Sequence, residues 1–205
     1  NGAAQVANLR ITGGTVSGAG TLTLTGPSEW TAGTLTGPAA GMGQLTLSGP
    51  GPLNVTGSTK VFNGAVTNAG TLVINGDDIR SNVTGSTFTN TGLIDLQGNG
   101  LSFLLNQPST LINSVGGTLR RSVGTGTVTI NLPLTNNGTI DVDTGVLAVQ
   151  GGGTSSGVVD AATGATLDFT GGSFAFDSGA SSTGAGLVRV NGGTVNLNGT
   201  TSFTN

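Results

Sequence analysis

A short pattern repeats along the whole chain: a Gly, a small polar residue, and then a few residues in which apolar positions alternate. Clear copies begin at Gly20, Gly70 and Gly138, reading Gly-Thr-Leu-Thr-Leu, Gly-Thr-Leu-Val-Ile and Gly-Thr-Ile-Asp-Val. Alternation with a period of two is typical of short β-strands with one buried face, and Gly is typical of the turns between them. Helix signals are missing, because Lys and Glu total only two residues and no long stretch has apolar residues at helical spacing.

The spacing of these strands indicates a repeat architecture. The glycines that open successive strands recur with a period of about 24 residues. Other short strands lie between them, and two or three strands per period is what one coil of a parallel β-solenoid needs. We therefore predict a single all-β domain over residues 1–205, a right-handed parallel β-helix of about nine coils of about 23–24 residues without helical caps. The glycines are Gly20, Gly43, Gly70, Gly92, Gly117, Gly138, Gly164 and Gly186.

The composition excludes several classes of function. A chain with 35% hydrophobic residues and a net charge of −3 is not typical of disorder, and six scattered basic residues are too few for a nucleic-acid surface. No run approaches the roughly 18 apolar residues of a membrane span. Because Cys and His are absent, disulfides, Cys-based zinc sites and His-dependent catalysis are excluded, and we expect no cofactor.

Pairs of carboxylates are the remaining catalytic option, as in β-solenoid enzymes that act on carbohydrates. Asp141 and Asp143 flank Val142 and should both point outward, and Asp77 and Asp78 fall in a turn. A glycosidase pair is geometrically conceivable at such positions. Solvated carboxylates on a strand and in a turn are the better interpretation, so we expect a protein without catalytic activity.

One column of polar residues supports the solenoid register. Four Asn residues follow one another at intervals close to the period of the strands, and an Asp continues the series after one further interval. Equivalent Asn side chains on successive coils can stack and exchange amide hydrogen bonds. The spacing therefore predicts a ladder formed by Asn68, Asn90, Asn113, Asn136 and Asp160.

A second column carries charges of largely alternating sign, three residues after each strand-opening Gly. With one residue inserted after Gly164, it consists of Asp95, Arg120, Asp141, Asp168 and Arg189. Side chains stacked about 4.8 Å apart on an outer face can pair between coils, each exposed pair contributing roughly 0–1 kcal/mol. The column predicts a charge ladder that discourages slippage of the coil register.

Threonine is abundant, with 34 residues, which raises the possibility of a flat Thr array that orders water on an ice surface. Such an array needs Thr at the same outer position in many consecutive coils. The column three residues after the strand-opening Gly begins with Thr23 and Thr46 and then continues with Val73, so it breaks after two coils. This register does not predict an ice-binding face.

The two ends of the chain carry compatible patterns. The final segment, residues 201–205, repeats the pattern of residues 86–90, so we expect the chain to stop at the position of the Asn ladder. Asn1-Gly2 placed after this segment resembles residues 134–138. Neither end shows an amphipathic helix or a charged loop, which are devices that protect open strand edges. We expect further coils or a second copy at each end, with the contact formed by Asn1, Gly2, Phe203, Thr204 and Asn205.

Segments such as Gly18-Ala19-Gly20-Thr21-Leu22-Thr23-Leu24 and Phe88-Thr89-Asn90-Thr91-Gly92 cover essentially the whole chain. In them the chain resembles bacterial cell-surface β-strand repeat proteins, the group that includes haemagglutinin-like adhesins and autotransporter passenger domains. The resemblance implies a protein exported from a bacterium and used for adhesion, stalk formation or extracellular structure.

Three functions remain open at this point. The preferred hypothesis is an extracellular structural subunit that stacks end to end into a filament, or forms a surface stalk with adjoining repeats. The second is an adhesin segment that binds carbohydrate or protein on another cell, and the third is a carbohydrate-active β-solenoid enzyme. We expect neither nucleic acid as a partner nor insertion into a membrane.

Overall fold

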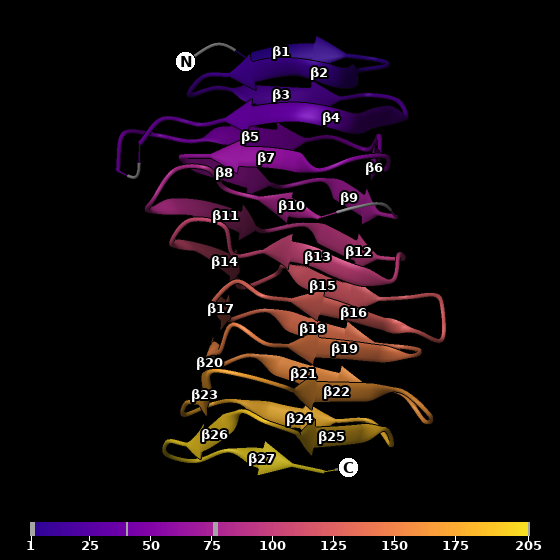
Figure 1. Ribbon diagram of the computed structural model, residues 1–205, viewed down its shortest axis with the longest axis vertical. Coiled ribbons are helices and arrows are strands. Elements are labelled where there is room, and N and C mark those ends of the chain that lie inside the picture. Colours follow the sequence, from indigo (N-terminus) through magenta and orange to yellow (C-terminus); the bar gives the residue numbers. More distant parts are fainter. Residues whose placement is uncertain (1–2, 40, 76–77, 205) are drawn as a thin grey trace.

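The computed structural model describes residues 3–39, 41–75 and 78–204, and this part of the chain contains strands and turns but no helix. The strands wind into coils that stack along one axis, with the two ends of the chain at opposite ends of the rod (Figure 1). Every strand pairing is parallel, and each strand pairs with its equivalent in the coils before and after it. The predicted all-β parallel solenoid of about nine coils is confirmed.

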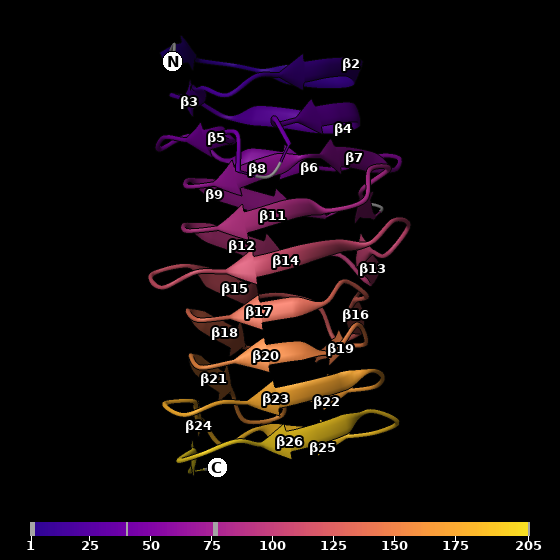
Figure 2. The ribbon, with the colours of Figure 1, turned by 90° about the vertical axis from the view of Figure 1, so that its left-hand side faces the viewer.

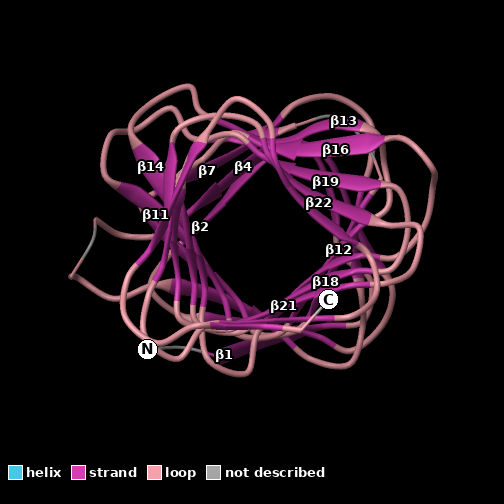
Figure 3. Cartoon of the chain, turned by 90° about the horizontal axis from the view of Figure 1, so that it is seen from below, coloured by secondary structure: helices cyan, strands magenta, loops and turns pink. Residues whose placement is uncertain are grey.

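Each coil has three faces, which the end-on view shows as a ring of strands around a central core (Figure 3). Face A comprises the ten strands of one sheet. They are β1 (Ala3–Val6), β3 (Thr21–Leu24), β5 (Leu45–Ser48), β8 (Ala65–Asn68), β11 (Ser86–Asn90), β14 (Ser109–Asn113), β17 (Leu134–Asn136), β20 (Gly153–Ser155), β23 (Ser173–Phe176) and β26 (Thr194–Leu197).

Faces B and C follow face A in every coil, and the two long strands β2 (Arg10–Ser17) and β4 (Ser28–Thr36) bend around the corner between them. The remaining strands of face B are β6 (Leu53–Val55), β9 (Thr71–Ile74), β12 (Leu93–Leu96), β15 (Thr118–Arg121), β18 (Thr139–Val142), β21 (Val158–Ala161), β24 (Ser181–Thr183) and β27 (Ser202–Phe203). Those of face C are β7 (Lys60–Asn63), β10 (Ile79–Arg80), β13 (Gly100–Leu104), β16 (Thr127–Ile130), β19 (Val146–Val149), β22 (Thr166–Phe169) and β25 (Leu187–Val190).

The coils differ in length more than the sequence period predicts. Ala3 pairs with Thr21 and Thr21 pairs with Thr46, so the second of these two coils is clearly the longer. The predicted coil length therefore describes an average from which individual coils depart. The strand-opening glycines do not form one column either: Gly20 and Gly43 precede strands of face A, the next four precede face B, and Gly164 and Gly186 precede face C.

Apolar side chains fill the interior in vertical columns. The strands alternate buried and partly exposed residues, as a strand packed on one side requires. Phe88 of face A makes edge-to-face contacts with Phe62 and Phe103 of face C, with ring centroids 5.4 and 5.5 Å apart. One column on face B consists of Leu53, Leu72, Ile94, Leu119, Ile140 and Val159.

Glycine is required where the chain enters face B, because successive coils approach closely there. A Cβ atom at Gly92 would overlap the carbonyl oxygen of Gly70, and one at Gly138 would overlap that of Gly117. The next member of this column is Gly157 rather than Gly164, since a Cβ at Gly157 would overlap the Gly138 carbonyl. The column explains why Gly recurs at this corner in consecutive coils.

Candidate functional site

The predicted Asn ladder is confirmed for its four Asn residues. Asn68, Asn90, Asn113 and Asn136 end consecutive strands of face A, and their side chains point into the core and are buried. In each step Nδ2 of one Asn donates a hydrogen bond of 2.8 Å to Oδ1 of the next. Burying an amide is favourable only when its hydrogen bonds are satisfied, and stacking satisfies them.

The ladder also joins face A to face B. Asn90 Nδ2 donates to the carbonyl oxygen of Thr118 at 3.0 Å, and Asn113 Nδ2 donates to that of Thr139 at 2.9 Å. Both acceptors lie in the first residue of the face B strand one coil further on. Each Asn therefore fixes the corner of the next coil as well as its neighbour in the ladder.

The predicted continuation of the ladder to Asp160 is wrong. Asn136 Nδ2 instead donates to Ser155 Oγ at 3.0 Å, and Asp160 lies on face B between Asp141 and Thr183. The coil that separates Asn136 from Ser155 is shorter than those between the four Asn residues. Asp160, which lies further along the chain than Ser155, has therefore already passed the corner onto the next face.

Replacing Asn113 with Ala should destabilise the protein strongly. The change removes one acceptor of Asn90 Nδ2, which keeps its bond to the Thr118 carbonyl, and it removes the donor to the buried Asn136 Oδ1. A buried group left without a partner costs roughly 1–3 kcal/mol. Urea unfolding monitored by circular dichroism measures this loss. Asn137→Ala is the matched control, because Asn137 is exposed and its removal should change the free energy of unfolding by less than about 0.5 kcal/mol. Equal losses in both variants would contradict a stabilising role for the ladder.

Three residues of the predicted charge ladder share one column, and an ion pair joins two of them. Asp95, Arg120 and Asp141 are cross-strand neighbours on face B. Arg120 Nε lies 3.5 Å from Asp141 Oδ2, and Arg120 Nη2 lies 2.6 Å from Oδ2 of Asp143 in the following turn. On the other side, Asp95 Oδ2 accepts a hydrogen bond from Gln97 at 2.8 Å.

Asp168 and Arg189 do not belong to this column, which corrects the prediction. They are neighbours on face C, where Arg189 Nη2 lies 2.6 Å from Asp168 Oδ2. The position after Asp141 on face B is held by Asp160, so two carboxylates stack there in place of alternating signs. The sequence analysis had to insert one residue after Gly164 to bring Asp168 into the column. The insertion was needed because Gly164 precedes a strand of face C, whereas Gly138 precedes a strand of face B.

The carboxylate of Asp141 is perturbed by its surroundings. Burial raises the pKa of Asp141, and the neighbouring Asp143 and Asp160 carboxylates raise it further, whereas Arg120 opposes the shift. The ionised form of Asp141 is therefore less favourable in the folded protein than in the unfolded chain. Protonation of Asp141 stabilises the fold.

Folding stability should fall as the pH rises from 3.8, the ordinary pKa of an Asp, through the raised pKa of Asp141. The sign follows because the folded state binds more protons than the unfolded state across that interval. Asp141→Asn should flatten this part of the profile, measured by urea unfolding at a series of pH values. Asp143→Asn should narrow the interval, since it removes one source of repulsion. An unchanged profile in Asp141→Asn would contradict the assignment.

The pair Asp141 and Asp143 lies on the outer face of β18 and in the turn after it, with Arg120 bound to both carboxylates. Asp77 lies outside the described residues, and Asp78 lies 3.7 Å from Arg80 Nε.

Among the residues that the structure describes, no group of three or more Asp, Glu, His or Cys could hold a metal ion. Within the same ranges, no helix has the length and apolarity needed to cross a membrane.

Arg121 is a buried residue whose role the sequence analysis missed. Its guanidinium donates to the carbonyl oxygens of Leu96 at 3.0 Å and Gly98 at 2.6 Å, and to Asn99 Oδ1 at 2.9 Å. Burial lowers its pKa. Arg121 thereby holds the turn from face B to face C in the preceding coil. The only sequence signal was its place on the inward side of the alternation, next to the outward Arg120.

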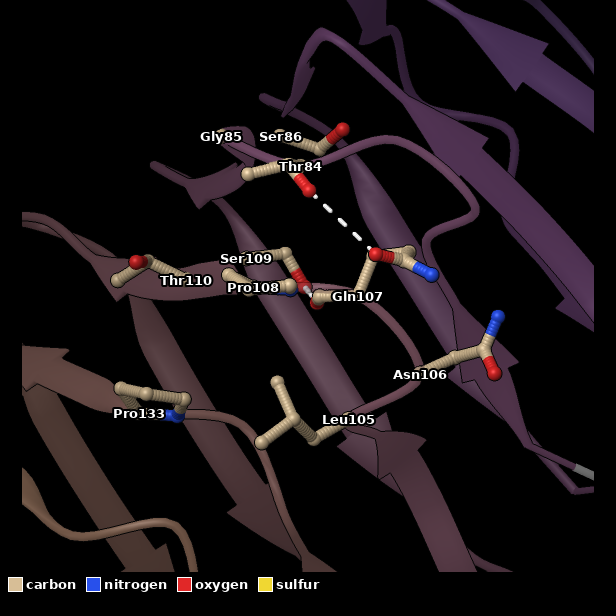
Figure 4. Close-up of a pocket in the computed structure, with 10 residues that line it drawn as sticks. All are labelled: Thr84, Gly85, Ser86, Leu105, Asn106, Gln107, Pro108, Ser109, Thr110 and Pro133. Carbon is tan, nitrogen blue, oxygen red and sulfur yellow. Dashed lines mark hydrogen bonds between the residues drawn. The ribbon is translucent and has the colours of Figure 1, made fainter.

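A hollow of about 640 Å³ lies at the corner between faces C and A. Leu105, Pro108 and Pro133 give it apolar walls, and Asn106 and Gln107 give it a polar rim (Figure 4). Thr84 Oγ1 donates to Gln107 Oε1 at 3.4 Å across the turns of two coils. The hollow contains no charged residue and lies outside the columns predicted from the sequence.

The residues predicted for end-to-end contact are only partly placed. Asn1, Gly2 and Asn205 lie outside the described residues. Thr204 N donates to the carbonyl oxygen of Ser182 at 3.0 Å, and Phe203 pairs with Ser182 on face B. The match to residues 86–90 suggested the ladder position on face A, and that placement is wrong, because the terminal segment lies one face further along the coil.

The final coil leaves core residues uncovered. By register, Val190 stacks on the buried Phe169, and Leu197 stacks on the buried Phe176, so both point inward. They are nevertheless 54% and 61% exposed, since no described strand covers them. Inward residues of faces C and A are therefore exposed at the final described coil.

Comparison of the chain with models of protein families, with curated proteins and with solved structures found no match. The class that the fold defines is the parallel β-solenoid.

Proposed function

We propose that this protein is an extracellular structural element of a bacterium, a β-solenoid whose coils are continued at its ends into a filament or a surface stalk. The continuation consists of a second copy joined head to tail or of adjoining repeats of the same polypeptide. The contribution of the chain is then mechanical: a stiff rod rather than a catalyst.

The open core at the final coil is the observation that carries this proposal. Val190 and Leu197 are inward residues without cover among the described strands, and the backbone edges of β25 and β26 are paired there on one side only. Such an edge is a template for another parallel strand. A contact that repeats without closing on itself produces an open filament.

The first strand, β1, is a suitable partner for β26 in a second copy. Leu197 and Ala4 belong to the same inward column of face A, and Asn196 and Ala3 belong to the same outward column. If β26 of one copy pairs with β1 of the next copy, both columns continue across the junction. Neither strand contains a charged residue, so no repulsion opposes the contact. The low overall charge acts in the same direction.

Electron microscopy of the purified chain tests the filament. We expect uniform fibres one solenoid wide in negative stain, and we expect Val190→Asp combined with Leu197→Asp to abolish them, because two carboxylates would be buried at each junction. Val115→Asp is the matched control, since Val115 is 82% exposed on a turn away from the ends, and it should leave fibres intact. Short rods alone in the wild type would exclude self-assembly and favour a stalk segment.

Adhesion to carbohydrate is the second candidate, and the hollow at the corner of faces C and A favours it. Amides and hydroxyls beside apolar walls suit a sugar, which offers hydroxyls and apolar ring faces. A glycan array probed with the wild type should then show binding that Gln107→Ala weakens at least tenfold and that Gln150→Ala, an exposed control, leaves unchanged. Absence of any bound glycan would contradict this candidate.

A further inference from the structure

Face A differs from the other two faces because its strands contain no charged residue. Faces B and C carry the strand residues Arg10, Glu29, Lys60, Arg80, Asp95, Arg120, Arg121, Asp141, Asp160, Asp168 and Arg189. In the ten strands of face A there is no Lys, Arg, Asp or Glu. The strands of this face are therefore neutral over the described length of the rod.

The outward residues at the centre of face A are almost all threonines. The strand register aligns one residue from each of seven consecutive coils in a single column, and six of the seven are Thr. The column consists of Thr21, Thr46, Thr67, Thr89, Ile112, Thr135 and Thr154. The sequence analysis did not find it, because the strand-opening glycines that set its register change from face A to face B after Gly43.

Two threonines of a second column widen the array in two of the coils. Thr87 and Thr110 are cross-strand neighbours in a second column, two residues before Thr89 and Ile112 along their strands. Parallel strands are about 4.8 Å apart and outward residues within a strand about 6.6 Å apart, so methyl and hydroxyl groups recur at these two spacings. Figure 2 shows β11, β14, β17, β20 and β23 stacked directly below one another, which keeps the array in register.

The hydroxyl groups of this array are available to solvent. Within the described part of the chain, no side-chain hydrogen bond engages the hydroxyls of Thr89, Thr135 or Thr154, and the first two residues are half-buried and the third is exposed. Thr67 is the exception, because its hydroxyl donates to Gln44 Oε1 at 2.8 Å and it is only 3% exposed. The accessible array therefore extends from β11 to β20, and the small Ala175 continues the column on β23.

We propose that face A binds ice, with the threonine array holding an ordered layer of water that merges with the crystal. Hydroxyls can anchor water molecules at regular positions, and the methyl groups between them favour a cage-like arrangement of the same layer. Charged groups bind water in orientations that ice does not accommodate, and face A has none in its strands.

The same features disfavour other partners for face A. Protein interfaces are enriched in aromatic residues, Met and Arg, whereas Phe88, Phe174 and Phe176 of this face are buried. Nucleic acids and anionic membrane surfaces need cations, which these strands lack. A neutral, hydroxyl-bearing array of regular spacing matches a crystal of water better than it matches a macromolecule.

Partition into growing ice tests the proposal. An ice shell is frozen slowly from a dilute solution of the full chain, and the protein in ice and in liquid is measured by Trp fluorescence. We expect several-fold enrichment in the ice and inhibition of ice recrystallisation. Thr135→Tyr combined with Thr154→Tyr should reduce the enrichment to that of a protein excluded from ice, because the bulky rings break the lattice.

The matched control combines Thr139→Tyr with Thr166→Tyr, which places the same rings at half-buried outward positions on faces B and C. This variant should keep the wild-type enrichment. Circular dichroism checks the fold of both, and the Thr135→Val, Thr154→Val pair, which removes only the hydroxyls, replaces the Tyr pair if that pair unfolds. Exclusion of the wild type from ice, or equal loss in both double variants, overturns the proposal. Binding to microcrystalline cellulose without partition into ice would instead assign the face to polysaccharide.

Discussion

Parallel stacking of each residue on its equivalent in the next coil is the constraint on which the rest of this structure depends. Because like positions recur about every 4.8 Å, any property of one residue is multiplied along the rod. Apolar residues then form continuous inner columns, and charges of one sign would repel their neighbours. The chain keeps its charged residues few and pairs several of them, as in Arg120 with Asp141 and Asp143 and in Arg189 with Asp168.

A polar group in the interior needs hydrogen-bond partners, and stacked coils can supply them. The Asn ladder fulfils this condition by passing hydrogen bonds from coil to coil and to the neighbouring corner, and Arg121 fulfils it by donating to the turn of the preceding coil. Both devices hold a corner between two faces. The apolar columns alone would tolerate a slip along the strand more easily, because one aliphatic residue packs much like another.

The three faces of the rod are chemically distinct, although they share one core. Faces B and C carry the charges in the strands, face A carries neutral hydroxyls, and the corner between C and A holds a hollow. In the proposed assembly, stacking uses the ends of the rod and leaves its sides free for recognition. The structural role and the ice-binding face that we propose therefore do not compete for the same residues.

The sequence by itself determined the class of fold, the strand alternation and the stacking of Asn68, Asn90, Asn113 and Asn136, because these depend on local periodicity and on a region where successive coils are nearly equal in length. It did not determine which face a residue occupies. Coil length varies elsewhere along the rod, and no local pattern shows which turn has shortened. The errors at Gly164, Asp160, Asp168 and Phe203 and the missed threonine column have this one origin. Only the tertiary structure decided which face each residue occupies, because that depends on the lengths of all the preceding turns, and the strand pairing between coils reveals those lengths.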